Sequence, residues 1–446
     1  MKVLRFGALA ICTGAFVAGC SGYVPPSRVS NTTPSNAESS LAPQKKTGAS
    51  ALTVLHVFRL PAQGQNPYAP VVADSAGNIF GETNQGGHLT SGGGCGTVFE
   101  LKASGAVYTE STLHVFHSEP DGCGPSGGLT IDSNGAVYGT TEWGGTTAGQ
   151  GAGTVFKLTP SGSGYKYAVI YRFKNNRDGA WPVGRVLISN GEVYGATQYG
   201  ASYACAGNTE GCGTVYKLTP SGNTYKETIL YVFKGGDDGL LPIAGVAIGS
   251  SGALYGTTQF GGGFGSIGDG AVYKLTPSRS GYRESVIHAF GYSGDGSTPW
   301  APVIVESNGE VVGTTLYGGG GSNGGGMVFR LTPSGSKYQE TILYRFAGGS
   351  DGSQPQAPVI EDRGILLGTT SDGADGFPCR RECGTIYELR PNSSGYQHTV
   401  LFRFREQTGY FPRAGVILRE HALFGATYFG GDKRKYAAGT VFRLRY

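Results

Sequence analysis

The sequence has few of the residues and patterns that build helices. It contains only 2 methionines among 446 residues, and after the first twenty positions no stretch repeats apolar residues every three to four positions. A strong excess of one charge sign is also missing, because the formal net charge is only +4. Sequence-independent binding of nucleic acid needs a clustered basic surface. We therefore expect a nearly all-β protein with no nucleic-acid partner.

Signatures of common catalytic and metal sites are absent too. There is no Gly-x-Ser-x-Gly elbow and no histidine pair at metal-binding spacing. His56, His114 and His288 occupy a repeat position that holds tyrosine or phenylalanine elsewhere, so we expect them to be structural. We predict no catalytic residue, no bound metal and no cofactor.

Glycine, in contrast, is abundant at 79 residues, and it punctuates a repeat. The clearest unit covers residues 213–270, where Gly, Pro, Asn, Asp or Ser clusters end each of four short apolar runs, as they do between consecutive β-strands. Runs like GTVYKL recur at spacings of 55 to 60 residues and begin at Gly96, Gly153, Gly213, Gly270, Gly326, Gly384 and Gly439. The other three runs also occur seven times, so each unit predicts one four-stranded blade.

The two ends of the repeat region are out of phase with the unit. Leu52 to Phe58 matches the fourth run, whereas Gly439 to Tyr446 matches the third, which gives 28 strands in all. In a ring of blades, pairing of the two chain ends completes the last blade and protects its edge. We therefore predict an all-β fold, a seven-bladed β-propeller of four-stranded blades, closed by the N-terminal strand.

The repeats share specific sequence motifs. YGTT recurs, as at Tyr138–Thr141 and Tyr255–Thr258, a GG follows it, and GTVFKLTP stands at Gly153–Pro160. With these motifs, residues 51–446 resemble the bacterial tandem-repeat family known as GloVer repeats. The resemblance implies a propeller-like β fold and a location in the cell envelope, and it brings no established activity.

The amino terminus has the pattern of an export signal. Residues 1–20 combine a basic start, an apolar run too short to span a membrane, and an ending, Val17 to Cys20, that resembles the lipobox of bacterial lipoproteins. We predict lipidation of Cys20 and anchoring to the outer membrane or cell surface, with an ordinary signal peptide as the alternative. Residues 21–50 are rich in Ser, Pro, Asn and Thr and predict a flexible tether before the propeller at 51–446.

Six cysteines remain once Cys12 and Cys20 are assigned to the signal and the lipid. An even number of cysteines in an exported protein indicates disulfides. A zinc site is the competing explanation, but no histidine stands beside these cysteines to act as a further ligand. The blade pattern predicts three pairs: Cys95 with Cys123, Cys205 with Cys212, and Cys379 with Cys383.

The loops after the second and fourth strands of each blade should share one face, which we name the loop face. Aromatic residues recur there, after the second strand and beside the blade proline, and could bind a sugar or a protein partner or else pack between blades. The candidate ligand-binding residues are Trp143, Tyr199, Phe260, Tyr317, Phe429, Trp181 and Trp300.

An Asp-Gly pair stands four residues before five of the blade prolines. A ring of carboxylates could bind cations, but the alternating acids of a calcium loop are missing. We expect turns in which Asp bonds to nearby backbone and Gly takes a positive φ angle. The aspartates are Asp121, Asp178, Asp238, Asp295 and Asp351.

Three classes of function follow. The leading hypothesis is a lipid-anchored, non-enzymatic envelope scaffold that binds a polysaccharide or an envelope protein at the loop face. The alternative is an extracellular polysaccharide lyase or glycoside hydrolase, for which Glu82 and Glu142 are the carboxylates to inspect, although we expect both to face solvent. The third class is a purely structural or adhesive module.

Overall fold

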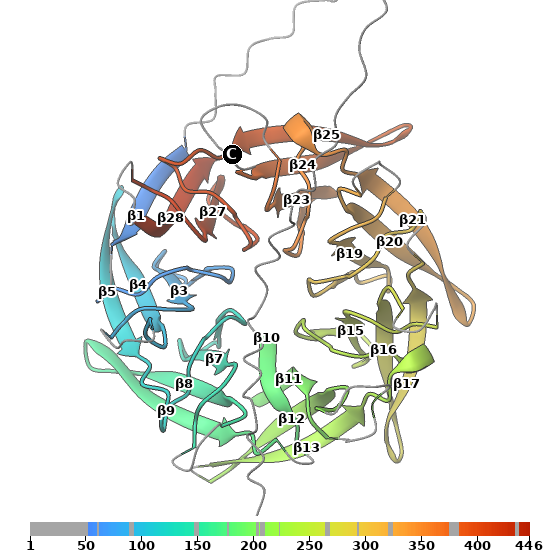
Figure 1. Cartoon of the computed structure of the whole chain (residues 1–446), viewed down its shortest axis with the longest axis horizontal. Coiled ribbons are helices and arrows are strands. Elements are labelled where there is room, and N and C mark those ends of the chain that lie inside the picture. Colours follow the sequence, from blue (N-terminus) through green and yellow to red (C-terminus); the bar gives the residue numbers. More distant parts are fainter. Residues whose placement is uncertain are drawn as a thin grey trace, which may run out of the picture. The chain divides into compact units, whose positions relative to one another are not determined.

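The computed structural model describes residues 52–59, 62–88, 93–146, 151–175, 178–201, 205, 210–222, 224–263, 268–291, 294–319, 324–373, 383–432 and 437–446. These residues form seven antiparallel sheets of four strands, arranged as the blades of a β-propeller (Figure 1). Within them the only helical elements are two 3-10 turns, η1 (Gly236–Asp238) and η2 (Gly349–Asp351). The predicted fold is confirmed. The predicted signal, Cys20 and tether lie outside the described residues.

The blades follow one another along the chain, and within blades 1 to 6 the strands run in sequence order, whereas blade 7 combines β26, β27 and β28 with β1. Blades 1 to 3 consist of β2 (Val72–Ala73), β3 (Ile79–Thr83), β4 (Thr97–Ser104), β5 (Val107–Val115); β6 (Thr130–Ile131), β7 (Val137–Thr141), β8 (Thr154–Ser161), β9 (Gly164–Arg172); and β10 (Ala180–Ser189), β11 (Glu192–Tyr199), β12 (Thr214–Ser221), β13 (Thr224–Val232). Blades 4 and 5 consist of β14 (Ala247–Ile248), β15 (Leu254–Thr258), β16 (Ala271–Ser278), β17 (Gly281–Ala289); and β18 (Ile304–Val305), β19 (Val311–Thr315), β20 (Met327–Ser334), β21 (Lys337–Arg345). Blades 6 and 7 consist of β22 (Ile360–Asp362), β23 (Ile365–Thr370), β24 (Thr385–Asn392), β25 (Gly395–Arg403); and β26 (Ile417–Arg419), β27 (Ala422–Thr427), β28 (Ala437–Arg445), β1 (Leu52–Arg59).

The two ends of the ring meet in blade 7. β1 pairs antiparallel with β28, and the register begins at Leu52 opposite Leu444. Phe58 of β1 is fully buried, like the aromatic residue that closes the fourth strand of every other blade. Gly439 lies against the blade proline Pro67, so close that a Cβ would come within 2.6 Å of the proline ring. Blade 7 therefore packs on blade 1 through the contact that the repeat uses between all neighbouring blades.

The glycine of the YGTT motif makes room for the core. In blade 4, Gly256 pairs with Tyr273 across β15 and β16, and the tyrosine ring lies over the glycine. A Cβ on Gly256 would stand 2.3 Å from the Tyr273 hydroxyl oxygen. Because the second strand is buried on both faces, this aromatic ring fills the space between blades.

The innermost strand of blade 4 is shorter than the sequence predicts. We expected a strand from Ile243 to Ile248, but only Ala247 and Ile248 form the ladder of β14. The preceding segment begins at a proline, which has no N–H to donate to a ladder. In other blades a carbonyl of the corresponding segment accepts a hydrogen bond from the neighbouring blade. At the next boundary, for example, the Thr257 hydroxyl donates to the Ala301 carbonyl at 3.1 Å.

No described helix has the length and apolar character needed to cross a lipid bilayer.

Candidate binding site at the loop face

Backbone pairing confirms that the two sets of loops share one face. In six blades an isolated antiparallel bridge joins the loop that enters the blade to the residue after its second strand. Blade 3 makes the same pairing within β10 and β11, at Ala180 opposite Tyr199. The six bridges are Gln65 with Gln85, Cys123 with Trp143, Leu240 with Phe260, Ser297 with Tyr317, Ser353 with Asp372, and Tyr410 with Phe429. The candidate aromatics after the second strand therefore have fixed backbones.

The candidate aromatic side chains are mostly half-buried between blades. Trp181 contacts Trp143 edge to face at a centroid distance of 6.3 Å, and it contacts Tyr199 in the same manner at 5.0 Å. Phe260 and Trp300 pack against the apolar core between blades 3 and 4. Among the seven candidates Tyr317 is the most open, with 41% of its surface exposed.

Phe429 packs against its neighbours Tyr410, Phe411 and Tyr428, with centroid distances of 4.5 to 6.1 Å. The aromatic residues of the loop face thus contribute to packing while they keep edges toward solvent. Whether a ligand uses those edges remains a prediction.

Disulfides fasten the same loops. Cys95 is bonded to Cys123, which joins the two loops of blade 1 and its boundary with blade 2, and Cys205 is bonded to Cys212 within one loop. Cys383 is also disulfide-bonded, and its predicted partner Cys379 lies outside the described residues. Disulfides of this kind are typical of proteins exported to an oxidising compartment.

Glu82 departs from the repeat at a buried position. The corresponding residue in other blades is Thr or Ala, and the hydroxyls of Thr257, Thr314 and Thr369 donate to a carbonyl of the next blade. Glu82 is only 1% exposed, and its Oε1 accepts the Gly128 N–H at 2.7 Å. Our expectation that Glu82 faces solvent is wrong, because the side chain points into the boundary with blade 2.

Glu142 lies close to Glu82 and is half-buried. The Ser126 hydroxyl donates to its Oε1, so the three-residue segment from Ser126 to Gly128 donates to both carboxyl groups. The expectation of a freely solvated side chain is wrong here too, since burial raises the Glu142 pKa to about 7. Burial raises the Glu82 pKa to about 8, and the nearby Glu142 charge adds to the rise. At neutral pH one carboxyl is protonated and the other titrates.

Near Glu142 lie two tyrosines, Tyr68 and Tyr428, that both contact a cationic side chain. The guanidinium carbon of Arg413 lies 5.5 Å from the ring centroid of Tyr68 and 5.0 Å from that of Tyr428. Burial raises the pKa of both tyrosines, and the Glu142 charge adds to it, which places Glu142 near both hydroxyls. We name Tyr68, Ser126, Glu142, Arg413 and Tyr428 the mouth cluster.

The arginine of the mouth cluster has unused binding capacity. Its guanidinium is hydrogen-bonded with the Tyr68 side chain, but among the described residues Arg413 forms no ion pair, and its buried Nε finds no hydrogen-bond partner. A guanidinium held by two aromatic rings is preorganised for an anion, because little side-chain freedom is left to lose.

A second arginine without an ion pair lies on the innermost strand of blade 3. Arg185 stands where the other repeats have Pro or Gly, and its Nε donates to Thr130 Oγ1 in blade 2 at 3.1 Å. The surrounding blades lower its pKa by desolvation although solvent still reaches the side chain. The inner side of the propeller therefore carries two arginines that no described carboxylate neutralises.

Part of this site could be predicted from the sequence. It marked blade 1 as unusual, since Gln85 replaces the aromatic residue after the second strand. It also marked Glu82 and Glu142. Arg413 was missed because it stands at a variable repeat position, after the blade proline, where one neighbour, Tyr68, comes from the opposite end of the chain and the other, Tyr428, follows the second strand of the same blade.

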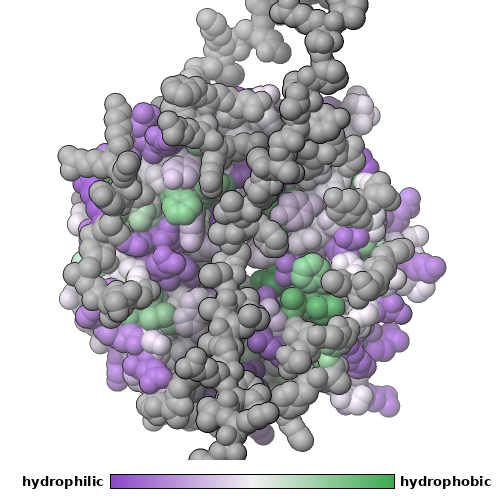
Figure 2. All heavy atoms as spheres, in the orientation of Figure 1, coloured by the Kyte–Doolittle hydropathy of each residue, from purple (hydrophilic) through white to green (hydrophobic). Residues whose placement is uncertain are grey.

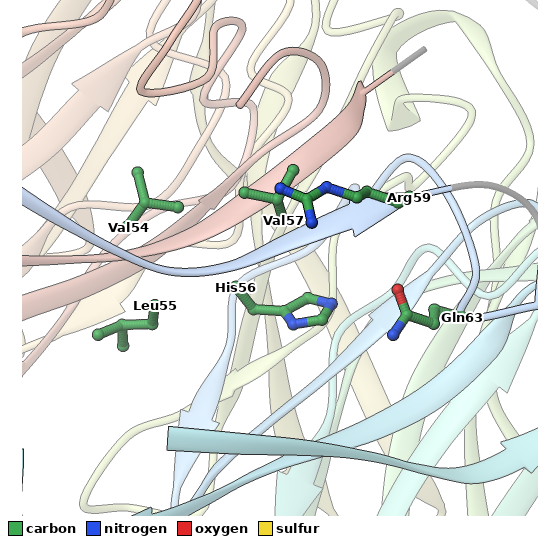
Figure 3. A pocket seen from close by; sticks show the side chains of 6 residues that line it. All are labelled: Val54, Leu55, His56, Val57, Arg59 and Gln63. Atoms are coloured by element: carbon green, nitrogen blue, oxygen red, sulfur yellow. The ribbon is translucent and has the colours of Figure 1, made fainter. Parts of the chain in front are cut away.

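A separate hollow of about 350 Å³ lies at the closing seam (Figure 3). It is lined by residues of β1 together with Gln63, and Figure 3 shows His56 and Gln63 on the same side of the strand. Burial, with help from the Arg59 charge, lowers the His56 pKa to about 4. Gln63 occupies the place of the Asp in the Asp-Gly pair, so the hollow marks a boundary whose usual carboxylate is missing.

The coloured part of the surface in Figure 2 is mostly hydrophilic, and its hydrophobic groups form small separate patches. This part of the face suits a polar ligand better than a broad apolar partner.

Comparison with known structures shows the fold alone. A candidate 6-phosphogluconolactonase from Bacteroides uniformis is 14% identical, with a TM-score of 0.50 over 79% of this chain and 89% of its own. A fungal alcohol oxidase of the AA5 family, solved in complex with copper, is 12% identical, with a TM-score of 0.53 over 89% of this chain and 77% of its own. No curated protein matches the sequence.

Comparison with protein families gives a closer relation. The Gloeobacter/Verrucomicrobia repeat matches residues 40–265 and again residues 263–446, which together contain every described strand. The chain belongs to the Gloeobacter/Verrucomicrobia repeat family.

Proposed function

We propose that this protein is a non-enzymatic binding scaffold of the cell envelope, anchored by a lipid at Cys20, and that its mouth cluster binds an acidic polysaccharide. The observation that carries the proposal is Arg413, a guanidinium held between Tyr68 and Tyr428 with no carboxylate partner among the described residues. A uronate carboxylate would supply the missing anion, and the flanking rings offer faces for a sugar.

The surroundings support an anionic ligand. Glu82 and Glu142 have raised pKa values, so the carboxyl groups at this blade boundary carry less negative charge at neutral pH than their number suggests. A protonated carboxyl can donate a hydrogen bond to a sugar oxygen. The fixed loop backbones and the Cys95–Cys123 disulfide limit the ordering cost of binding.

A second candidate function is cleavage of the same polymer by a lyase or hydrolase. Glu142 favours it, because a half-buried carboxyl with a pKa near 7 beside tyrosine hydroxyls suits general acid–base catalysis. Glu82 is too deeply buried to touch a substrate, so the cluster offers one accessible carboxyl where most glycoside hydrolases use two. This difference favours binding over cleavage.

The test is a panel of acidic polysaccharides and their carboxyl-reduced, neutral counterparts, offered to the chain from Ala51 onward, which contains every strand of the ring. Calorimetry would measure binding, and chromatography would measure released product. Saturable binding of an acidic glycan without product supports the scaffold. Product release would move the assignment to the enzyme. A preference for the neutral polysaccharides would contradict the binding of a uronate carboxylate by Arg413, in a scaffold and in an enzyme alike.

The same panel tests the aromatic residues. A Trp143→Ala, Trp300→Ala double variant that keeps its fold but loses affinity would assign these rings to the ligand surface. Unchanged affinity would leave them as packing residues.

A further inference from the structure

The outer rim of the propeller carries a polar contact between neighbouring blades that the repeat builds several times. A tyrosine near the end of one blade's outermost strand meets the Asp of the Asp-Gly pair and a residue on the next blade's outermost strand. The Tyr171 hydroxyl, for example, lies 3.0 Å from Asp178 Oδ2 and 3.0 Å from Glu227 Oε2. Tyr231 and Tyr344 likewise donate to Asp238 and Asp351, at 2.5 and 2.6 Å.

The aspartate in this contact also serves its own turn, as expected. Asp295 accepts the Gly291 N–H at 2.9 Å, and Gly296 follows with a φ angle of 92°. The carboxylate that faces the next blade is therefore held in place by its own loop.

Between blades 4 and 5 the tyrosine is replaced by His288. Its Nε2 lies 3.6 Å from Asp295 Oδ2 and 3.6 Å from Glu340 Oε1, too far for hydrogen bonds. His288 Nε2 and Glu340 Oε1 are both buried, and neither has a hydrogen-bond partner among the described residues. Buried polar atoms of this kind cost stability unless something fills the space between them.

The three residues have the chemistry and spacing of metal ligands. Their ligand atoms, one nitrogen and two carboxylate oxygens, all lie within 4.8 Å of one another. Atoms that share a tetrahedral zinc ion at bond lengths of about 2.0 to 2.1 Å stand roughly 3.3 Å apart, close to the two 3.6 Å separations. The His288 ring is fixed edge-on against Phe290 at 4.6 Å, which aims Nε2 at the carboxylates.

We propose that His288, Asp295 and Glu340 bind a divalent transition-metal ion of the zinc class and thereby link blades 4 and 5. An imidazole ligand favours zinc over calcium or magnesium, which prefer all-oxygen sites. The side chains are 16%, 30% and 15% exposed, so solvent can supply the remaining ligand. Arg345 is the nearby cation, and its guanidinium donates to the Gly294 carbonyl at 3.0 Å.

The experiment uses the full chain, purified without a histidine tag and stripped with chelator. Zinc chloride is titrated by calorimetry, and the midpoint of thermal unfolding is followed with and without zinc. We expect one tight ion per chain and a higher midpoint with zinc. Glu340→Gln should weaken binding at least tenfold, and His288→Tyr, which restores the residue of the Tyr171 contact, should abolish it while the protein stays folded.

The neighbouring boundary supplies a gain-of-function control. Tyr231→His places an imidazole beside Asp238 and Glu284 and should create a second zinc site. His114→Tyr should leave zinc binding unchanged, since His114 already pairs with Asp121 at 2.9 Å. The proposal is overturned if the wild-type chain binds no zinc at millimolar concentration. It is equally overturned if His288→Tyr and Glu340→Gln both bind as tightly as the wild type, which would place the ion elsewhere, for instance at His88 and His117.

Discussion

Glu82 shows how one departure from the repeat changes the physics of a boundary. Its folded pKa of about 8 lies above the ordinary value of 4.5 because burial disfavours the charged form. Because the pKa is higher in the folded state, protonated Glu82 contributes to the free energy of unfolding. This contribution is fully present below pH 4.5 and is lost as the pH rises through about 8. Ionisation therefore works against the fold on the alkaline side.

We predict that Glu82→Thr, the residue used in four other blades, flattens this dependence. The free energy of unfolding should rise by up to about 5 kcal/mol at pH 9 and change little at pH 4. Urea unfolding at both pH values measures it, with Thr257→Ser as a control at the same repeat position. Equal destabilisation of the variant at both pH values would contradict the account.

The aromatic residue that covers the YGTT glycine gives a second prediction at this scale. Tyr216, Tyr273 and Tyr387 are fully buried with hydroxyls that lack a partner among the described residues, whereas other blades have Phe. Tyr273→Phe should raise the free energy of unfolding by about 1 kcal/mol or leave it unchanged, because it removes an unsatisfied donor. A loss of more than about 1 kcal/mol in urea unfolding would show that the hydroxyl has a partner.

Residue roles were only partly readable from the sequence. The sequence identified Glu82 and Glu142 as unusual, but the direction of their side chains depends on Ser126 and Gly128, donors that another run of the chain supplies. A carboxylate after a strand looks solvated in sequence, and only the packed boundary shows that it is not. The environment of Arg413 was invisible for the same reason.

At the scale of elements, the sequence predicted much more. Each strand type recurs seven times, so the Gly, Pro, Thr and Phe positions reinforce one another. The β1–β28 pairing and the two described disulfides agree with the predicted phase and pairs. Outside blade 3 the innermost strands are short, and in blades 5 to 7 a backbone carbonyl before the strand accepts a threonine hydroxyl from the preceding blade, a use that no local pattern reveals.

The closing strand provides the prediction for this scale. Phe58 is as deeply buried as Phe233, which holds the same repeat position in blade 3. If the seam formed by the two chain ends is packed like the others, Phe58→Ala and Phe233→Ala should each lower the free energy of unfolding by about 3 to 5 kcal/mol. Urea unfolding of the pair measures this. A loss at Phe58 below about 1 kcal/mol, beside a full loss at Phe233, would show that β1 does not close the ring.

At the scale of the whole molecule, a few residues that depart from the repeat make a near-symmetric ring asymmetric. The repeat makes seven similar blades, and one group of departures from it lies where blade 7, blade 1 and blade 2 follow one another, at Arg413, Tyr68 and Glu142. One asymmetric site on a symmetric scaffold is how a propeller can bind a single ligand at its mouth. The metal site on the outer rim is independent of this function and concerns the boundary between blades 4 and 5.

The most direct test of the proposed function is the affinity of an acidic polysaccharide, chosen by the panel, for the wild-type chain and for Arg413→Gln. Arg363→Gln is the matched control, because this arginine is 81% exposed and pairs only locally with Asp362. We predict a loss of affinity of at least tenfold for Arg413→Gln, as expected for a charge-assisted hydrogen bond of about 1.5 to 3 kcal/mol, and no change for Arg363→Gln. Equal affinity of the wild type and Arg413→Gln would contradict the assignment of the mouth cluster as the binding site.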